Sequence, residues 1–370
     1  MKTAIGLMSG TSMDGIDVAL LHTDGQNRVE FGASMAIEYS SAFRQRLEQG
    51  MVDALRIEKR DDRPKGLAEL ECELTERHGD AVRQFLQANA IRSDQIDLLG
   101  FHGQTVLHRP NEGLTVQLGD GAALARMTGI DVVYDMRADD MVAGGQGAPL
   151  VPVFHQSLAQ LIDTQLPACF VNIGGISNIT YVDGEDLIAF DTGPGNALID
   201  QWVQSKGGIP FDQGGRIASE GSVVNQIVDE YLNAPFFDKG GCKSLDRGDF
   251  RPLDAARADL SDGARTLARI TAASIIKAID HLPKPPATWI LCGGGRLNDA
   301  IVSDLSQLAA QTNGVVILSD ELDLSGDMLE AQAFAYLAVR SKLGLPLTYP
   351  TTTGCRQPTA GGKLAKAEHT

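Results

Sequence analysis

The feature that most constrains this chain is a succession of elements that occurs twice: an apolar run, a glycine-rich turn and a second apolar run. The first copy comprises 5–8, the turn GTSMDG and 16–22, and the second lies within 169–182 around the turn NIGGISN. Apolar runs on both sides of such a turn predict a β-hairpin. Further predicted strands and helices follow each hairpin, so we expect two α/β lobes with a ligand cleft between them. Similarity between the two passes is too weak to identify a repeat by itself.

The remaining patterns place the lobe boundaries. Further strands are expected at 98–101, 115–118, 132–135, 187–191, 289–292 and 315–318, and helices within 41–89 and at 121–127, 197–205, 264–282 and 328–342. We assign residues 1–135 plus about 345–370 to an N-terminal lobe and residues 136–344 to a C-terminal lobe. The charged stretch 58–65 is interpreted as a solvated helix end, HGQT after 98–101 as a loop, and the polar tail after Thr351 as mobile at its end.

The charge of the chain argues against two classes of partner. The formal net charge is −16, and Lys and Arg are scattered along the sequence. A surface of that sign repels nucleic acid and anionic lipid, so we expect neither nucleic acid nor membrane as a partner. Phosphate must then be bound by local devices such as backbone amides, helix ends and a metal ion.

Cysteine usage and hydropathy indicate a cytoplasmic protein. The five cysteines form no CxxC pair and leave an odd one over, a pattern typical of a reducing compartment. The N-terminal MKTAIGLMSG has no apolar core long enough for a signal peptide, and no segment approaches the length of a membrane span.

Four loops rich in Gly, Asp and Thr follow predicted strands, where backbone amides and helix N-termini converge on ligands. The first is GTSMDG, 10–15, in which the glycines let the turn wrap a phosphate and Thr11 and Ser12 add hydroxyl donors. Asp14 can hold a magnesium ion through water. An ordinary hairpin turn is the alternative for this segment.

The other three loops lie in the second half of the chain. NIGGISN, 172–178, provides a second hairpin turn for phosphate, and GGGRLN, 293–298, offers bare backbone for a flat ring, with Asn298 or Arg296 at its edge. In FDTGPGN, Asp191 leaves an apolar strand and could serve as a general base. A turn or N-cap is the alternative for Asp191, and a linker is the alternative for the three glycines. His102 is interpreted as a substrate or loop hydrogen-bonding residue, and His108 as a loop residue.

Several catalytic motifs are absent. The sequence contains no GxxxxGK[ST], no GxGxxG opening a Rossmann unit, no HExxH and no GxSxG. The chain is therefore not a P-loop enzyme, and it lacks these signatures of dinucleotide-binding, zinc-protease and serine-hydrolase sites.

The three turns GTSMDGID, NIGGISN and GGGRLN resemble the two phosphate loops and the adenosine loop of the actin/Hsp70/hexokinase superfamily, which has a ribonuclease H-like fold. The longer strings GLMSGTSMDGIDVAL, GFHGQTVLHRP, QLGDGAALA, DMRADDMVAGGQGAPLVP, NIGGISNIT and FDTGPGNALID resemble the anhydro-N-acetylmuramic acid kinases in particular. The resemblance extends from Ile5 to about Gly344.

This resemblance implies an enzyme of peptidoglycan recycling that converts 1,6-anhydro-N-acetylmuramic acid, ATP and water into N-acetylmuramic acid 6-phosphate and ADP. It implies ATP contacts from Gly10, Thr11, Ser12, Met13, Asp14, Gly15, Ile16 and Asp17, Asp191 as the catalytic base, and a homodimer. We add as hypotheses that Asp14 binds Mg²⁺, that Gly174 and Gly175 approach the phosphates, that Gly293, Gly294 and Gly295 face adenine, and that His102, Arg137 and Glu330 contact the sugar.

Two other functions compete with this interpretation. One is another sugar kinase of the same superfamily that phosphorylates a free hydroxyl, which needs no water in the product. The other is an ATP-gated binding module of the actin or Hsp70 type. Incorporation of oxygen from labelled water distinguishes the first alternative, and ATP-dependent polymerisation tests for a filament-forming protein.

Overall fold

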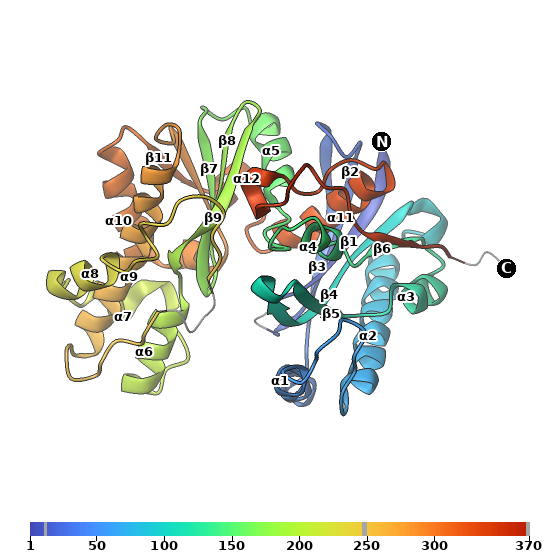
Figure 1. Cartoon of the computed structure of the whole chain (residues 1–370), viewed down its shortest axis with the longest axis horizontal. Coiled ribbons are helices and arrows are strands. Elements are labelled where there is room, and N and C mark those ends of the chain that lie inside the picture. Colours follow the sequence, from blue (N-terminus) through green and yellow to red (C-terminus); the bar gives the residue numbers. More distant parts are fainter. Residues whose placement is uncertain (11–12, 246–249, 368–370) are drawn as a thin grey trace. The chain divides into compact units, whose positions relative to one another are not determined.

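The computed structural model describes residues 1–10, 13–245 and 250–367, and it divides into two compact units. The first unit consists of Met1–Leu161 and the chain from Met328 onward, and the second is Ile162–Asp327 (Figure 1). The expected boundaries near 135 and 345 are corrected by this division. The reason is that α5 (Pro152–Leu161) and α11 (Leu329–Lys342) pack against the first unit, where α11 contacts β1, β2 and β4.

The first unit contains a seven-stranded mixed sheet of order β12-β6-β4-β1-β2-β3, with β5 paired to β4. The strands are β1 (Lys2–Ser9), β2 (Gly15–Thr23), β3 (Val29–Glu38), β4 (Leu98–Arg109), β5 (Leu114–Leu118), β6 (Val132–Tyr134) and β12 (Lys363–Ala365). The first hairpin is confirmed, because β1 and β2 pair antiparallel and β3 continues the meander. Strands β4 and β6 then run parallel to β1.

Helices cover this sheet. They are α1 (Ser41–Ala54), α2 (Leu67–Ala88), α3 (Gly121–Thr128), α4 (Ala138–Val142), α5, α11 and α12 (Pro350–Thr353). The predicted start and end of α3 are confirmed: Asp120 caps its first turn through the amides of residues 122 and 123, and Gly129 ends it in the left-handed conformation. Helix α11 is buried over most of its length.

The second unit repeats the strand order in a five-stranded sheet, β11-β10-β7-β8-β9. Its strands are β7 (Ala168–Ile173), β8 (Ile176–Asp183), β9 (Asp186–Pro194), β10 (Thr288–Cys292) and β11 (Val315–Leu318), and its helices are α6 (Ala197–Gly207), α7 (Arg216–Ser219), α8 (Asn225–Leu232), α9 (Leu260–Lys277) and α10 (Asp299–Ala310). Here too an antiparallel meander is followed by two parallel strands. The prediction of an α/β protein with two units is confirmed.

Two local predictions are corrected, and one strand was not predicted. HGQT and His108 lie inside β4 and not in loops, because β4 continues past residue 101 to pair with β5. The stretch 58–65 connects α1 to α2, and its Arg63 forms a two-pronged ion pair with Glu71 instead of facing only solvent. In the C-terminal tail, 363–365 form β12, which pairs antiparallel with β6.

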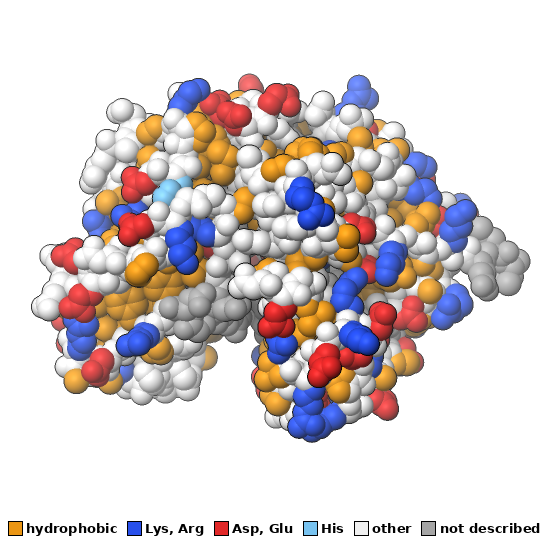
Figure 2. All heavy atoms as spheres, in the orientation of Figure 1, with side chains coloured by type: hydrophobic (Ala, Val, Ile, Leu, Met, Phe, Trp, Pro, Cys, Tyr) orange, Lys and Arg blue, Asp and Glu red, His pale blue; other side chains and the backbone are white. Residues whose placement is uncertain are grey.

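On the face shown in Figure 2, Lys and Arg side chains are interspersed with Asp and Glu. Among the residues that the structure describes, none of the helices combines the length and the apolar character that crossing a membrane requires.

Candidate functional site

A buried glutamine, Gln104, forms a hydrogen bond with the start of the turn that follows β1. The carbonyl of Gly10 accepts hydrogen bonds from the amide of Met13 at 3.1 Å and from Nε2 of Gln104 at 3.1 Å. The other end of the Gln104 amide accepts from the Ser9 hydroxyl at 2.6 Å, and Ser9 and Gln104 are both 1% exposed. The corrected course of β4 is what brings Gln104 beneath this turn. Sequence reasoning did not single out Gln104, although it lies within the string HGQT.

Two carboxylates follow the described start of this turn: Asp14 immediately before β2, and Asp17 within β2. Asp14 is exposed, and its carbonyl accepts from the amide of Tyr39 at 2.8 Å. Burial, followed by the charges of Asp14 and Asp17, raises the pKa of Tyr39. Both carboxylates therefore lie near the Tyr39 ring. Among the described residues no three His, Cys, Asp or Glu side chains gather to hold a metal ion, so Asp14 would act with few protein ligands.

Of the eight predicted ATP contacts at 10–17, six lie within the described residues. Thr11 and Ser12 lie outside the described residues. Ile16 is 1% exposed and belongs to the core of the first unit, so its side chain does not face a ligand. Gly15 lies so close to β3 that a Cβ would meet the carbonyl oxygen of Ile37 at 2.4 Å. Glycine is required there by this close approach.

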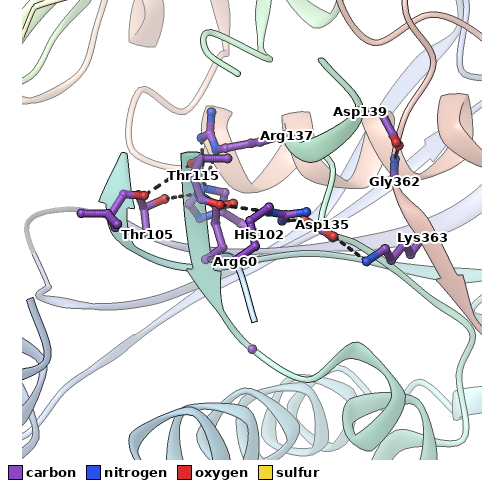
Figure 3. Close-up of polar contacts among 12 residues, drawn as sticks. Arg60, His102, Thr105, Thr115, Asp135, Arg137, Asp139, Gly362 and Lys363 are labelled. Atoms are coloured by element: carbon purple, nitrogen blue, oxygen red, sulfur yellow. Dashed lines mark hydrogen bonds and ion pairs between the residues drawn. The ribbon is translucent and has the colours of Figure 1, made fainter. Parts of the chain in front are cut away.

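The three predicted sugar-side residues belong to the first unit, and two of them are in direct contact (Figure 3). Nδ1 of His102 lies 2.8 Å from the carbonyl of Gly103, which makes Nδ1–H the donor and leaves Nε2 as an acceptor. Arg137 donates to this Nε2 from Nη2 at 3.0 Å, and from Nη1 to the carbonyl of Gly147 at 2.8 Å. Burial and the charge of Arg137 lower the pKa of His102 to about 3. His102 is therefore a neutral acceptor that orients the guanidinium.

Glu330 lies in the first turn of α11, as the sequence predicted. Burial raises the pKa of Glu330, and the charge of Arg137 opposes that rise. Burial lowers the pKa of Arg137 to about 10, while Glu330 and Asp140 support its charge. The Phe334 ring, one turn further along α11, packs on His102 with ring centroids 4.7 Å apart. The first unit thus brings a cation, a carboxyl group and an aromatic ring near one another.

In the second unit, the turn between β7 and β8 is held by the segment that follows β9. The carbonyl of Gly174 accepts from the amide of Asn196 at 2.7 Å, and the carbonyl of Gly175 accepts from Gly195 at 3.0 Å and from Ala197 at 3.2 Å. These bonds use carbonyl oxygens of the glycine turn. They fix the turn at the start of α6, where backbone amides favour an anion.

The glycines after β10 pack against the end of β7. A Cβ on Gly293 would lie 2.3 Å from Asn172 Oδ1, and one on Gly295 would lie 2.2 Å from the Ile173 side chain. Gly295 is buried, whereas Gly294 is exposed with only the Asn196 amide within 4 Å of a built Cβ. Of the three glycines, Gly294 is therefore the one whose surface is open to a flat ring.

Asn298 and Arg296, proposed for the edge of the base, have structural partners. The side-chain oxygen of Asn298 caps α10 by accepting from the amides of residues 300 and 301, which leaves its amide group for any ligand contact. The buried guanidinium of Arg296 forms ion pairs with Asp320 at 2.6 Å and Asp327 at 2.9 Å. Arg296 therefore links its loop to the segment at 320–327, and we do not place it at the edge of the nucleotide base.

Asp191 lies within β9, which continues to Pro194, and not at the end of the strand as predicted. Its amide donates to the carbonyl of Lys243 at 2.9 Å, and its Oδ2 accepts from the amide of Leu245 at 2.8 Å. The ammonium of Lys243 lies over the Phe236 ring, 4.5 Å from the ring centroid, and burial lowers its pKa. The segment at 243–245 thus orients the carboxylate, a contact that no sequence pattern indicated.

The similarity of this chain to known proteins extends over almost its whole length. A family model described as "Anhydro-N-acetylmuramic acid kinase" matches residues 2–367. Proteins of that name from Brucella suis, Rhizobium johnstonii and Agrobacterium fabrum are 56%, 53% and 53% identical, and the alignments cover 98%, 99% and 99% of this chain and the same shares of the relatives. Solved structures are more distant: component A of (R)-2-hydroxyglutaryl-CoA dehydratase from Acidaminococcus fermentans matches with a TM-score of 0.49 at 8% identity, covering 93% of this chain and 100% of that one.

Proposed function

The chain belongs to the anhydro-N-acetylmuramic acid kinase family, and we propose that it converts 1,6-anhydro-N-acetylmuramic acid, ATP and water into N-acetylmuramic acid 6-phosphate and ADP in peptidoglycan recycling. The observation that carries this proposal is the match of the family model to residues 2–367. The chain is a kinase on the same ground, and the near-complete coverage of the named relatives argues against a free-standing binding module.

The chemistry of the anhydro-sugar explains why a carboxylate is needed. Its O6 is bonded to C1, so it has no hydroxyl proton to lose. A base must instead take a proton from water while the water oxygen bonds to C1 and the C1–O6 bond breaks. The released O6 bonds to the γ-phosphorus of ATP, and the bond from that phosphorus to the β–γ bridging oxygen breaks to give ADP.

We assign the base to Asp191. Its carboxylate is held by the amide of Leu245, and a positioned carboxylate suits proton transfer better than a freely rotating one. Lys243, whose carbonyl accepts from the amide of Asp191, places a cation in the same segment.

We assign the sugar to His102, Arg137 and Glu330. The lactyl carboxylate of the muramic acid needs a cationic partner in a chain whose net charge is −16. Arg137 keeps its charge at neutral pH because the pKa of its guanidinium remains about 10. Two of its nitrogens are already oriented by His102 and Gly147, which lowers the cost of ordering the side chain on binding.

We assign ATP to the turn at 10–17, to Gly174 and Gly175, and to the loop from Gly293 to Asn298. Mg²⁺ usually keeps several waters and takes one or two carboxylates together with phosphate oxygens, so a single exposed Asp14 fits such an ion. When bound, the ion would neutralise charge on the phosphates. The family resemblance also leads us to propose a cytoplasmic homodimer. Among the described residues the cysteines form no disulfide, which supports a reducing compartment, and light scattering tests the dimer.

Labelled water tests the reaction. In ¹⁸O-water with ATP, the phosphorylated product should carry one ¹⁸O at C1 at the earliest times, and a control without ATP should give no product. A phosphorylated product without label would instead identify a kinase that acts on a free hydroxyl. ATP-dependent light scattering by the purified protein, without turnover of the sugar, would favour an actin-like filament.

A further inference from the structure

A buried carboxylate beside the sugar-side residues connects distant segments of the first unit. Asp140, in α4, is 2% exposed. Its Oδ1 accepts from the hydroxyls of Thr348 and Thr353, each at 2.6 Å, and its Oδ2 accepts from the amide of Gly147 at 2.6 Å. Hydrogen bonds to an ionised carboxylate are about twice as strong as those between neutral groups.

Gly147 connects the carboxylate of Asp140 to Arg137 through its two backbone hydrogen bonds. The amide of Gly147 donates to Asp140, and its carbonyl accepts from Nη1 of Arg137 at 2.8 Å. The intervening loop is folded closely around the carboxylate, since a Cβ on Gly145 would lie 2.2 Å from Oδ2 of Asp140. A change at Asp140 would therefore shift the carbonyl that orients Arg137.

The C-terminal segment at 348–356 also forms hydrogen bonds with the loop at 143–147. Thr348 precedes α12 and Thr353 is the last residue of this helix, and the carbonyl of Thr353 accepts from the amide of Gln146 at 2.9 Å. The amide of Arg356 donates to the carbonyl of Ala143 at 3.0 Å. Thr353 and Arg356 thus hydrogen bond to the backbone of the loop, and Thr348 and Thr353 hydrogen bond to the carboxylate of Asp140.

We propose that Asp140 is a positioning residue for sugar binding: with Thr348 and Thr353, it fixes Gly147 and thereby aims Arg137 at the substrate carboxylate. The inference rests on the proposed role of Arg137. Asp140 itself is surrounded by protein donors and does not touch the sugar. Its contribution appears in the affinity for the sugar and not in the affinity for ATP.

Asp140→Asn and Asp140→Ala test the proposal by steady-state kinetics with each substrate varied in turn. We expect either variant to raise the KM for the sugar about ten-fold, which corresponds to about 1.4 kcal/mol, and to leave the KM for ATP within two-fold. Asp139→Asn is the matched control, because the Asp139 carboxylate is exposed and accepts from the amide of Gly362 at 3.0 Å (Figure 3). It should leave both KM values unchanged.

The same substitutions in an Arg137→Ala background separate positioning from general destabilisation. If Asp140 acts through Arg137, Asp140→Asn adds less than a two-fold change in sugar KM once Arg137 is absent. A full ten-fold effect in both backgrounds, or no effect in either, would overturn the inference. Should Arg137→Ala itself leave the sugar KM unchanged while labelled water still reaches C1, the proposed role of Arg137 fails and the family activity stands.

Discussion

The close approach of α11 to the sheet makes Gly6→Ala a stringent test of the fold. Gly6 lies in β1, and a Cβ there would be 1.7 Å from the carbonyl oxygen of Ala331 and 2.6 Å from the amide nitrogen of Ala335. Real Cβ atoms essentially never come closer than 3.0 Å, so the helix and the strand must separate by about 1.3 Å, the difference between 3.0 and 1.7 Å. Ala331 follows Glu330, so the proposed sugar-binding carboxyl group moves with the helix.

The expected energetic cost is large. Overpacking of a well-packed core costs about 1–3 kcal/mol, and here the obstructing atoms belong to helix backbone that cannot rotate away. In a domain of about 150–250 residues, 1 kcal/mol lowers the midpoint of thermal unfolding by about 2–4 °C. Taking the upper value of about 3 kcal/mol, we expect Gly6→Ala to lower the midpoint of the first unit by about 6–12 °C and to raise the sugar KM.

Circular dichroism during heating and steady-state kinetics provide the assay. Gly66→Ala is the control, because a Cβ at Gly66 meets nothing within 4 Å, and the φ of Gly66 is −87°. It should melt within about 2 °C of the parent protein. The reasoning is refuted if Gly6→Ala melts like Gly66→Ala and binds the sugar equally well.

Three further predictions follow from particular side chains. Asp191→Asn should lower kcat by about two to four powers of ten and leave the KM for ATP within a few-fold, because the asparagine oxygen can still accept from Leu245; near-normal turnover would exclude Asp191 as the base. Burial lowers the pKa of His78 to about 4 and that of His155 to about 3, so the unfolded chain binds protons first as the pH falls. The free energy of unfolding should therefore be highest above about pH 6.5 and should decrease below it by about 1.4 kcal/mol per pH unit for each histidine. Urea titrations at pH 7.5 and 5.5 measure this decrease, which should be smaller in His78→Gln than in the parent protein. Asp304→Ala should destabilise the second unit by about 3–5 kcal/mol, because this carboxylate is 2% exposed and its loss would leave the part-buried Arg265 on α9 without its partner; urea unfolding with an unchanged midpoint would contradict this.

The features that the sequence predicted correctly depend on neighbours along the chain. Both glycine hairpins, the Asp120 cap and the Gly129 stop of α3 follow from backbone preferences over a few residues. The position of Glu330 in the first turn of the last long helix is of the same kind.

The errors arose where a distant segment pairs with the one considered. HGQT was expected in a loop, because the pairing of β4 with β5 depends on a partner later in the chain. The strand at 363–365 was not predicted, because the edge of β6 that it joins cannot be recognised from the tail itself. Arg296 was one of two residues suggested for the edge of a base, but its partners Asp320 and Asp327 lie 24 and 31 residues further along the chain.

From sequence alone, this chain could be assigned to its family, to a two-unit α/β class and to a set of glycine turns suited to phosphate, because these depend on residue identity and short-range backbone preference. Only the tertiary structure revealed how the turns are supported. Gln104 lies under Gly10, Leu245 orients Asp191, and Thr348 and Thr353 reach Asp140 across more than 200 residues. A hydrogen bond depends on distance in space, and sheet pairing brings together donors and acceptors that the order of the sequence keeps far apart.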